Sequence, residues 1–105
     1  MSHLVGKIHG VKINTVDELN ELMNSVAREC KFNVVGNSFH QFEPYGATGV
    51  LVLAESHFSA HTYPENDMVY IDVFCCAKDF MPYECADIIR KTFQALKAEW
   101  RVIPR

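Results

Sequence analysis

The sequence predicts an α+β fold, a two-layer sandwich in which one antiparallel sheet carries two helices on the same face. Two segments carry apolar residues at spacings of three and four, the period of a buried helical stripe. The segments between them alternate apolar and polar residues, as strands do, and short turn sequences separate them, as antiparallel hairpins require. A length of 105 residues suits one hydrophobic core, so we expect a single domain spanning residues 1–105.

A strand and a helix are predicted at the start of the chain. Residues 3–11 are compatible with a strand that glycine interrupts. Thr15 and Glu18 have the spacing of a capping box, which marks the first turn of a helix. The apolar stripe of this helix consists of Val16, Leu19, Leu22, Met23, Val26, Ala27 and Cys30. Such a continuous stripe predicts a helix that packs against a core.

Further strands are predicted between the two helices. They cover residues 31–42, 49–54, 57–63 and 68–77. A Glu-Pro-Tyr-Gly turn follows the first of them, and a Pro-Glu-Asn-Asp turn joins the last two as an antiparallel hairpin.

The second helix is predicted to begin near Met81 and Pro82, because proline is tolerated in the first helical turn. Its apolar stripe consists of Cys85 or Ala86, Ile89, Phe93, Leu96 and Trp100. Residues 102–103 are expected to add a short edge strand. The predicted order is therefore β-α-β-β-β-β-α, followed by this edge strand.

The alternation within the predicted hairpin sorts its side chains onto two faces. The apolar set, expected under the helices, consists of Phe58, Ala60, Thr62, Val69, Ile71, Val73 and Cys75. The opposite set consists of His57, Ser59, His61, Tyr70, Asp72, Phe74 and Cys76. A face that needed only solubility would favour Lys, Glu and Thr. We therefore expect this polar face to contact a partner or a substrate.

Composition excludes several classes of function. The net charge of −3, with scattered basic residues, gives no electrostatic reason to bind nucleic acid. No signal peptide pattern and no apolar run of membrane-spanning length are present, so we expect no membrane association and a cytoplasmic location. In that compartment Cys30, Cys75, Cys76 and Cys85 are expected to be reduced.

A zinc site is the alternative interpretation of the histidines. His57 and His61 on one strand, with Cys76 opposite and His40 or His9 nearby, would supply ligands that zinc accepts. However, the chain contains no Cys-x-x-Cys or His-Glu-x-x-His spacing. We therefore predict no metal.

Several short motifs between Phe39 and Cys76 occur together at specific spacings. They are Phe39-His40-Gln41-Phe42, Pro44-Tyr45-Gly46, Glu55-Ser56-His57, His61-Thr62-Tyr63-Pro64-Glu65 and Asp72-Val73-Phe74. With this combination the chain resembles the bacterial-type S-adenosylmethionine decarboxylase proenzymes, a pyruvoyl-dependent family, over most of its length. Without these neighbours, Ser56 would be interpreted as an ordinary serine at the end of a strand.

The resemblance implies that the chain cuts itself between Glu55 and Ser56. The Ser56 hydroxyl would attack the Glu55 carbonyl to give an ester, and β-elimination and hydrolysis would then convert Ser56 into a pyruvoyl group, the covalent cofactor. The products would be chains 1–55 and 56–105, held together by the sheet they share. This step needs a strained peptide, an oxyanion donor and a base, for which His57 and His61 are candidates.

The resemblance also implies roles for other residues. His61 would assist processing together with Thr48, which stands where the family usually has a serine. Cys76 would be the catalytic proton donor. Glu65 would hold the ribose hydroxyls, and Phe42 would stack on adenine. Members of the family form homodimers through their sheets, with each active site drawing on both protomers, which agrees with the polar face.

The function that this resemblance implies is decarboxylation of S-adenosylmethionine for polyamine (spermidine) synthesis. The chain departs from the family at Gly6-Lys7-Ile8, where Ala-Glu-Phe is common. Pyruvoyl-dependent decarboxylation of ornithine or arginine is therefore an alternative. A second alternative is an uncut, non-catalytic paralogue.

Overall fold

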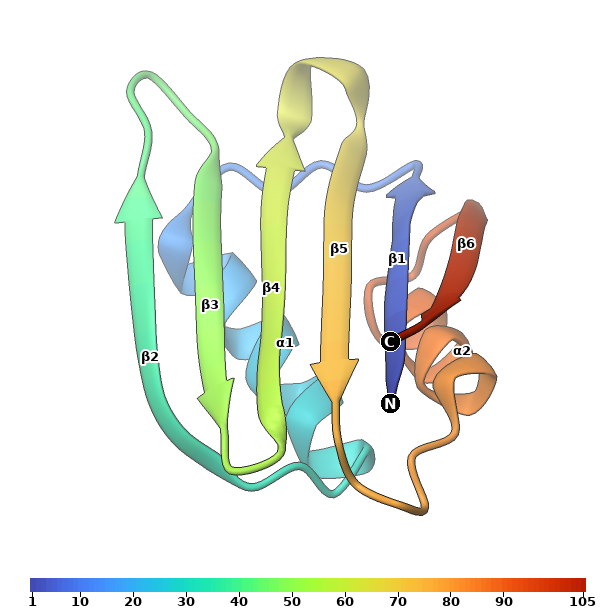
Figure 1. Ribbon diagram of the computed structural model, residues 1–105. Coiled ribbons are helices and arrows are strands. Elements are labelled where there is room, and N and C mark those ends of the chain that lie inside the picture. Colours follow the sequence, from blue (N-terminus) through green and yellow to red (C-terminus); the bar gives the residue numbers. More distant parts are fainter.

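One antiparallel sheet with two helices on one face makes up the computed structural model, which describes all residues 1–105 (Figure 1). The strand order is β2-β3-β4-β5-β1-β6. The elements are β1 (Ser2–His9), α1 (Val16–Glu29), β2 (Val34–Gln41), β3 (Ala47–Leu53), β4 (Ser56–Tyr63), the 3₁₀ turn η1 (Pro64–Asn66), β5 (Met68–Cys75), α2 (Pro82–Thr92) and β6 (Lys97–Pro104). The predicted fold class is confirmed. Neither helix has the length and apolar character needed to cross a membrane.

The predicted capping box at the start of α1 is present. Thr15 Oγ1 accepts a hydrogen bond from the Glu18 backbone N–H at 3.2 Å, and Glu18 Oε1 accepts one from the Thr15 N–H at 3.2 Å. The buried residues of α1 are Leu19, Met23, Val26 and Ala27, the centre of the predicted stripe. The predicted start of α1 and the centre of its predicted buried stripe are therefore confirmed.

The prediction for the second helix is wrong at its C-terminal end. Helix α2 ends at Thr92, and Gln94 adopts a left-handed φ of 55°. The Gln94 N–H donates to the Lys91 carbonyl and the Ala95 N–H donates to the Arg90 carbonyl, as in a Schellman motif. Leu96 is consequently 86% exposed, and Trp100 lies on β6. Apolar residues continue at helical spacing beyond Thr92, but the helix ends there, and no glycine marks the left-handed position after it.

The predicted edge strand is confirmed but is longer than expected. β6 covers Lys97–Pro104 and pairs along the whole of β1, with Gly6 opposite Trp100. A Cβ atom on Gly6 would lie 2.1 Å from the Glu99 carbonyl oxygen and 2.4 Å from Cε3 of Trp100. Glycine at this departure from the family pattern therefore lets the indole lie against β1.

The two faces of the sheet differ as the alternation predicted. The expected apolar set is buried under the helices, including Thr62, whose Oγ1 accepts a 2.9 Å hydrogen bond from the Ala47 N–H. The opposite face, which is turned toward the viewer in Figure 1, carries no helix. It presents the polar side chains of β1, β4 and β5 to solvent or to a partner.

Replacement of Gly6 by alanine is expected to destabilise the fold by about 1–3 kcal/mol, because the added methyl group must displace backbone as well as the indole. The midpoint of urea unfolding measures this change. Gly36→Ala is the matched control, because the nearest atom to its new Cβ would be Val52 Cβ at 3.7 Å. Equal midpoints for the two variants would contradict the assigned packing of Trp100.

Candidate active site

The candidate residues form two groups at opposite ends of β4. Ser56 begins the strand and is paired with Cys75 of β5. His61 lies five residues farther along and is paired with Thr48 of β3 and Tyr70 of β5. At roughly 3.3 Å per residue the separation is about 16 Å. A single chain therefore brings Cys76 close to Ser56 but keeps His61 away from it.

The peptide link between Glu55 and Ser56 lies in a tight turn. Ala54 and Glu55 connect β3 to β4, with Leu53 opposite Ser56. Two-residue hairpin loops favour residues that accept positive φ, such as glycine and asparagine. Here the loop residues keep negative φ, and Ser56 takes a φ of 154°. This region is populated almost only by glycine and costs about 1–3 kcal/mol. Backbone strain therefore lies at Ser56, directly after the Glu55 carbonyl.

The carbonyl group of Glu55 has a fixed hydrogen-bond donor. The Cys76 N–H donates to the Glu55 carbonyl oxygen at 3.0 Å. The Glu55 side chain is held separately, because its Oε1 accepts a hydrogen bond from the Asn33 N–H at 3.2 Å. A donor on this carbonyl is the arrangement that stabilises negative charge developing on the oxygen.

Cys76 is the one exposed thiol of the chain. It follows the last residue of β5 directly, so its backbone position is fixed by the Glu55 carbonyl. Its neighbour Cys75 is buried on the helix face, and burial raises the pKa of the Cys75 thiol. Cys75 is therefore buried as the alternation predicted, and Cys76, one residue beyond the end of β5, is exposed.

At the far end of β4, aromatic rings surround His61. Thr48 Oγ1 is hydrogen-bonded to Nδ1 of His61. The rings of Phe42 and Tyr63 pack edge-on against the imidazole, with centroids 5.5 and 5.1 Å away. The contact with Thr48 fixes the ring orientation and leaves Nε2 as the free nitrogen. Phe42 itself is 39% exposed, so its ring remains available to another molecule.

Glu65 lies at the same end of the sheet, in η1. Together with Lys12, Asn14, Tyr45 and Pro64 it lines a shallow cleft of about 260 Å³. No hydrogen bond or ion pair holds its carboxylate. The carboxylate is therefore free to accept hydrogen bonds from a ligand.

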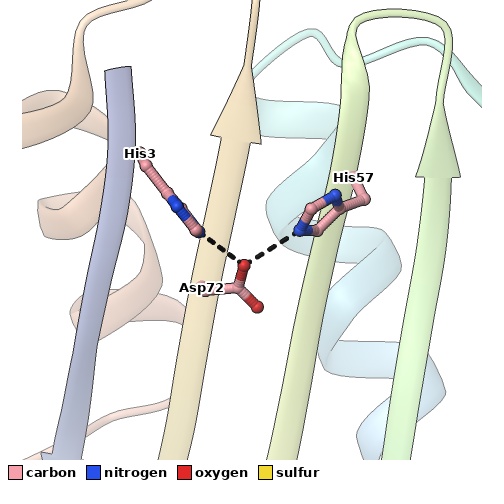
Figure 2. A group of neighbouring side chains, drawn as sticks. All are labelled: His3, His57 and Asp72. Carbon is pink, nitrogen blue, oxygen red and sulfur yellow. Dashed lines mark hydrogen bonds and ion pairs between the residues drawn. The ribbon is translucent and has the colours of Figure 1, made fainter. Parts of the chain in front are cut away.

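Between the two ends, a carboxylate is shared by two imidazoles (Figure 2). Asp72 Oδ2 lies 2.8 Å from Nε2 of His3 and 2.9 Å from Nε2 of His57, and Ser59 donates to Oδ1. Burial alone would raise the pKa of Asp72, but the hydrogen bonds from Ser59, His3 and His57 outweigh burial and lower it. Asp72 therefore stays ionised at neutral pH and anchors the middle of the face.

This cluster changes the interpretation of the histidines. The ligand set that the sequence offered for zinc is not assembled, because His57 is bound to Asp72 and His61 to Thr48. The only group of potential metal ligands that converges is His3, His57 and Asp72. His3 was not identified from the sequence, because nothing local indicates that β1 pairs with β5.

Comparison with known proteins places the chain in a family. The profile of the family described as S-adenosylmethionine decarboxylase matches residues 2–105. The chain belongs to the S-adenosylmethionine decarboxylase family. It is 42% identical over 94 residues to the S-adenosylmethionine decarboxylase proenzyme of Symbiobacterium thermophilum, covering 90% of this chain and 71% of the relative. The corresponding proenzyme of Aquifex aeolicus is 36% identical over 90 residues, covering 83% and 67%.

A solved structure of the family has the same fold. The crystal structure of the adenosylmethionine decarboxylase from Aquifex aeolicus superimposes with a TM-score of 0.89 at 30% sequence identity. The match covers 99% of this chain and 88% of that chain. The strand order and the helix-free face described above are therefore those of a decarboxylase of this family.

Asp72→Asn is expected to lower the free energy of unfolding by about 1–3 kcal/mol at pH 7, because the variant loses charge-assisted hydrogen bonds. The folded-state pKa of Asp72 lies below its usual value, so its stabilisation exists above that value and is lost as the pH falls through the lowered pKa. The variant should therefore lose less stability than the unsubstituted protein between about pH 5 and pH 2.

Chemical denaturation across this pH range measures both effects. Asp67→Asn is the control, because Asp67 is exposed and its nearest cation, Lys12 Nζ, lies 3.9 Å away. Identical acid sensitivity of the D72N variant and the unsubstituted protein would contradict the role of Asp72.

Proposed function

We propose that this chain is a self-processing, pyruvoyl-dependent S-adenosylmethionine decarboxylase that serves spermidine synthesis. The observation that carries the proposal is the geometry at the Glu55–Ser56 link. A strained serine follows a carbonyl that already accepts a hydrogen bond from the Cys76 N–H at 3.0 Å. Membership of the family supplies the substrate class.

Self-cleavage follows from this geometry in ordered steps. The Ser56 hydroxyl attacks the Glu55 carbonyl carbon, and the Cys76 N–H stabilises the charge that develops on the oxygen. Breaking the peptide C–N bond gives an ester and relieves the strain at Ser56. A base then removes the Ser56 Cα proton, and β-elimination expels the new carboxylate of Glu55. Hydrolysis of the resulting dehydroalanine releases ammonia and leaves chains 1–55 and 56–105.

The surroundings of Ser56 fit a pyruvoyl group. The residue begins β4 and is partly exposed, and Cys76, whose N–H donates to the preceding carbonyl, carries an exposed thiol. The group would supply a carbonyl that bonds to the substrate amine and accepts electrons as carbon dioxide leaves. Cys76 would then return a proton to the substrate carbon, since a thiol can act as a general acid at neutral pH.

Two copies of the chain are needed to complete this site. Ser56 and Cys76 lie at one end of the sheet, and His61, Phe42 and Glu65 lie at the other. A two-fold axis running between two facing sheets, across their strands, would bring the first end of one copy opposite the second end of the other. We therefore infer a homodimer that buries the polar faces, with His61 and Thr48 of one protomer assisting processing in the partner.

The same arrangement assigns the substrate contacts. Phe42 offers an exposed aromatic ring that can stack on adenine, and the unpaired Glu65 carboxylate can accept hydrogen bonds from the ribose hydroxyls. Ornithine and arginine have neither an adenine ring nor ribose hydroxyls, although their cationic groups could also pair with the Glu65 carboxylate. Family membership therefore favours the nucleoside substrate over the basic amino acids.

Intact mass and activity test the proposal together. The purified protein should appear as chains 1–55 and 56–105, with a pyruvoyl terminus on the second, and should release carbon dioxide from S-adenosylmethionine but not from ornithine or arginine. Ser56→Ala should remain a single chain of 12.0 kDa without activity. Ser38→Ala, on the edge strand β2, is the control that should be cut normally. An unsubstituted chain that stays uncut would favour the non-catalytic alternative.

Mixed dimers test whether each site draws on two protomers. His61→Ala alone should be cut at least about 10²-fold more slowly than the unsubstituted chain, as expected for loss of acid–base assistance. In dimers that combine the S56A and H61A chains, one site keeps both Ser56 and His61. The H61A chain, distinguished by a mass tag, should therefore be cut efficiently after co-expression with S56A. If each site lay within one protomer, co-expression would leave its rate unchanged.

A further inference from the structure

A second cleft lies on the helix side of the protein, and its lining includes Glu55, the residue before the proposed cut. It has a volume of about 460 Å³ and opens between the C-terminal end of α1 and the N-terminal end of α2. Its walls include Phe32 and Phe80, and its lining includes the thiols of Cys30, Cys75 and Cys85. The proposed decarboxylase chemistry uses none of these thiols.

Two of these thiols are in direct contact. The Sγ atoms of Cys30 and Cys85 lie 3.6 Å apart and share a hydrogen bond. Cys30 caps the end of α1 and is partly exposed in the cleft, whereas Cys85 is buried in the first turn of α2. A disulfide needs the sulfur atoms at about 2.05 Å, so the two sulfur atoms must approach each other by about 1.5 Å.

The contact also makes the two thiols chemically unequal. The hydrogen bond with Cys85 lowers the pKa of Cys30, although burial and the neighbouring Glu29 carboxylate act to raise it. The same hydrogen bond, together with burial, raises the pKa of Cys85. Cys30 is the more exposed of the two thiols and lines the cleft, so it is the thiol that an oxidant reaches first, and buried Cys85 is positioned to resolve an oxidised Cys30.

We propose that Cys30 and Cys85 form a hydroperoxide-sensitive dithiol whose disulfide links the segments on either side of the Glu55–Ser56 bond. The Cys30 thiolate attacks a peroxide oxygen and breaks the O–O bond, giving a sulfenic acid and hydroxide, which is protonated to water. The Cys85 sulfur then attacks the Cys30 sulfur, and the hydroxyl group leaves as water with the Cys85 proton. In total, two thiols and one hydrogen peroxide give one disulfide and two waters.

The other thiols do not offer this reaction. Cys75 is buried, its pKa is raised by burial, and no hydrogen bond joins it to another thiol. Cys76 is exposed and is not among the residues that line the cleft. The pairing is therefore set by the fold, through the contact between α1 and α2.

The link between two separate chains depends on the proposed self-cleavage, but formation of the disulfide does not. The first measurement accordingly uses the uncut Ser56→Ala variant. After exposure to hydrogen peroxide, its mass should be lower than that of the reduced protein by two hydrogen atoms. Alkylation of the remaining thiols should then add two fewer alkyl groups than it adds to the reduced protein. Peptide mapping should recover a Cys30–Cys85 link, which a thiol reductant should reverse.

Variants separate this pair from the other thiols. Adding Cys30→Ser or Cys85→Ser to the S56A chain should abolish the link, whereas Cys76→Ser should leave it intact. Unfolding midpoints of the reduced variants check that each one folds. Absence of the link in S56A, or mapping to a different pair of cysteines, would overturn the proposal.

The unsubstituted protein gives the second measurement. On a denaturing gel, the oxidised chains 1–55 and 56–105 should migrate as one species without reductant and as two species with reductant. If the S56A chain forms the link but the unsubstituted protein is never cut, the proposed self-processing fails while the dithiol assignment stands.

Discussion

The antiparallel pairing of β4 with both of its neighbours is the constraint on which the candidate site depends. Pairing with β3 through a two-residue loop concentrates the backbone strain on Ser56. Pairing with β5 carries the chain to Cys76, whose N–H reaches the Glu55 carbonyl. The same straight strand holds His61 at the far end of the sheet. A single strand therefore holds the link proposed for cleavage at one end and His61, the imidazole proposed to assist it, at the other.

The middle of the polar face is organised by charge rather than by apolar packing. The Asp72 carboxylate is held by Ser59 and by two imidazoles from the flanking strands. Phe74 packs beside both imidazoles, with ring centroids 5.2 Å from His3 and 6.0 Å from His57. A surface of this kind suits contact with an equivalent surface, because polar groups that already have partners cost less to bury.

Local patterns predicted much of the fold and of the site. Alternation in β4 and β5 separated Thr62 and Cys75 from His57 and Cys76, and the Thr15–Glu18 spacing located the start of α1. The end of α2 was missed because Gln94, not glycine, takes the left-handed conformation there. The role of His3 was missed because it depends on β1 lying beside β5, a long-range pairing. The distance between Ser56 and His61 also required the observed register.

The position of β1 has a consequence for the order of folding and cutting. Residues before Ser56 supply β1, β2 and β3, and residues after it supply β4, β5 and β6, yet β1 lies between β5 and β6 (Figure 1). The two segments are therefore interleaved and are not adjacent halves. Covalent continuity lets the newly made polypeptide thread this arrangement as a unimolecular process. The two chains of a cut molecule, once denatured, would have to associate again before they could refold. Unfolding of the cut protein would therefore be harder to reverse, and its lifetime would depend on its rate of unfolding.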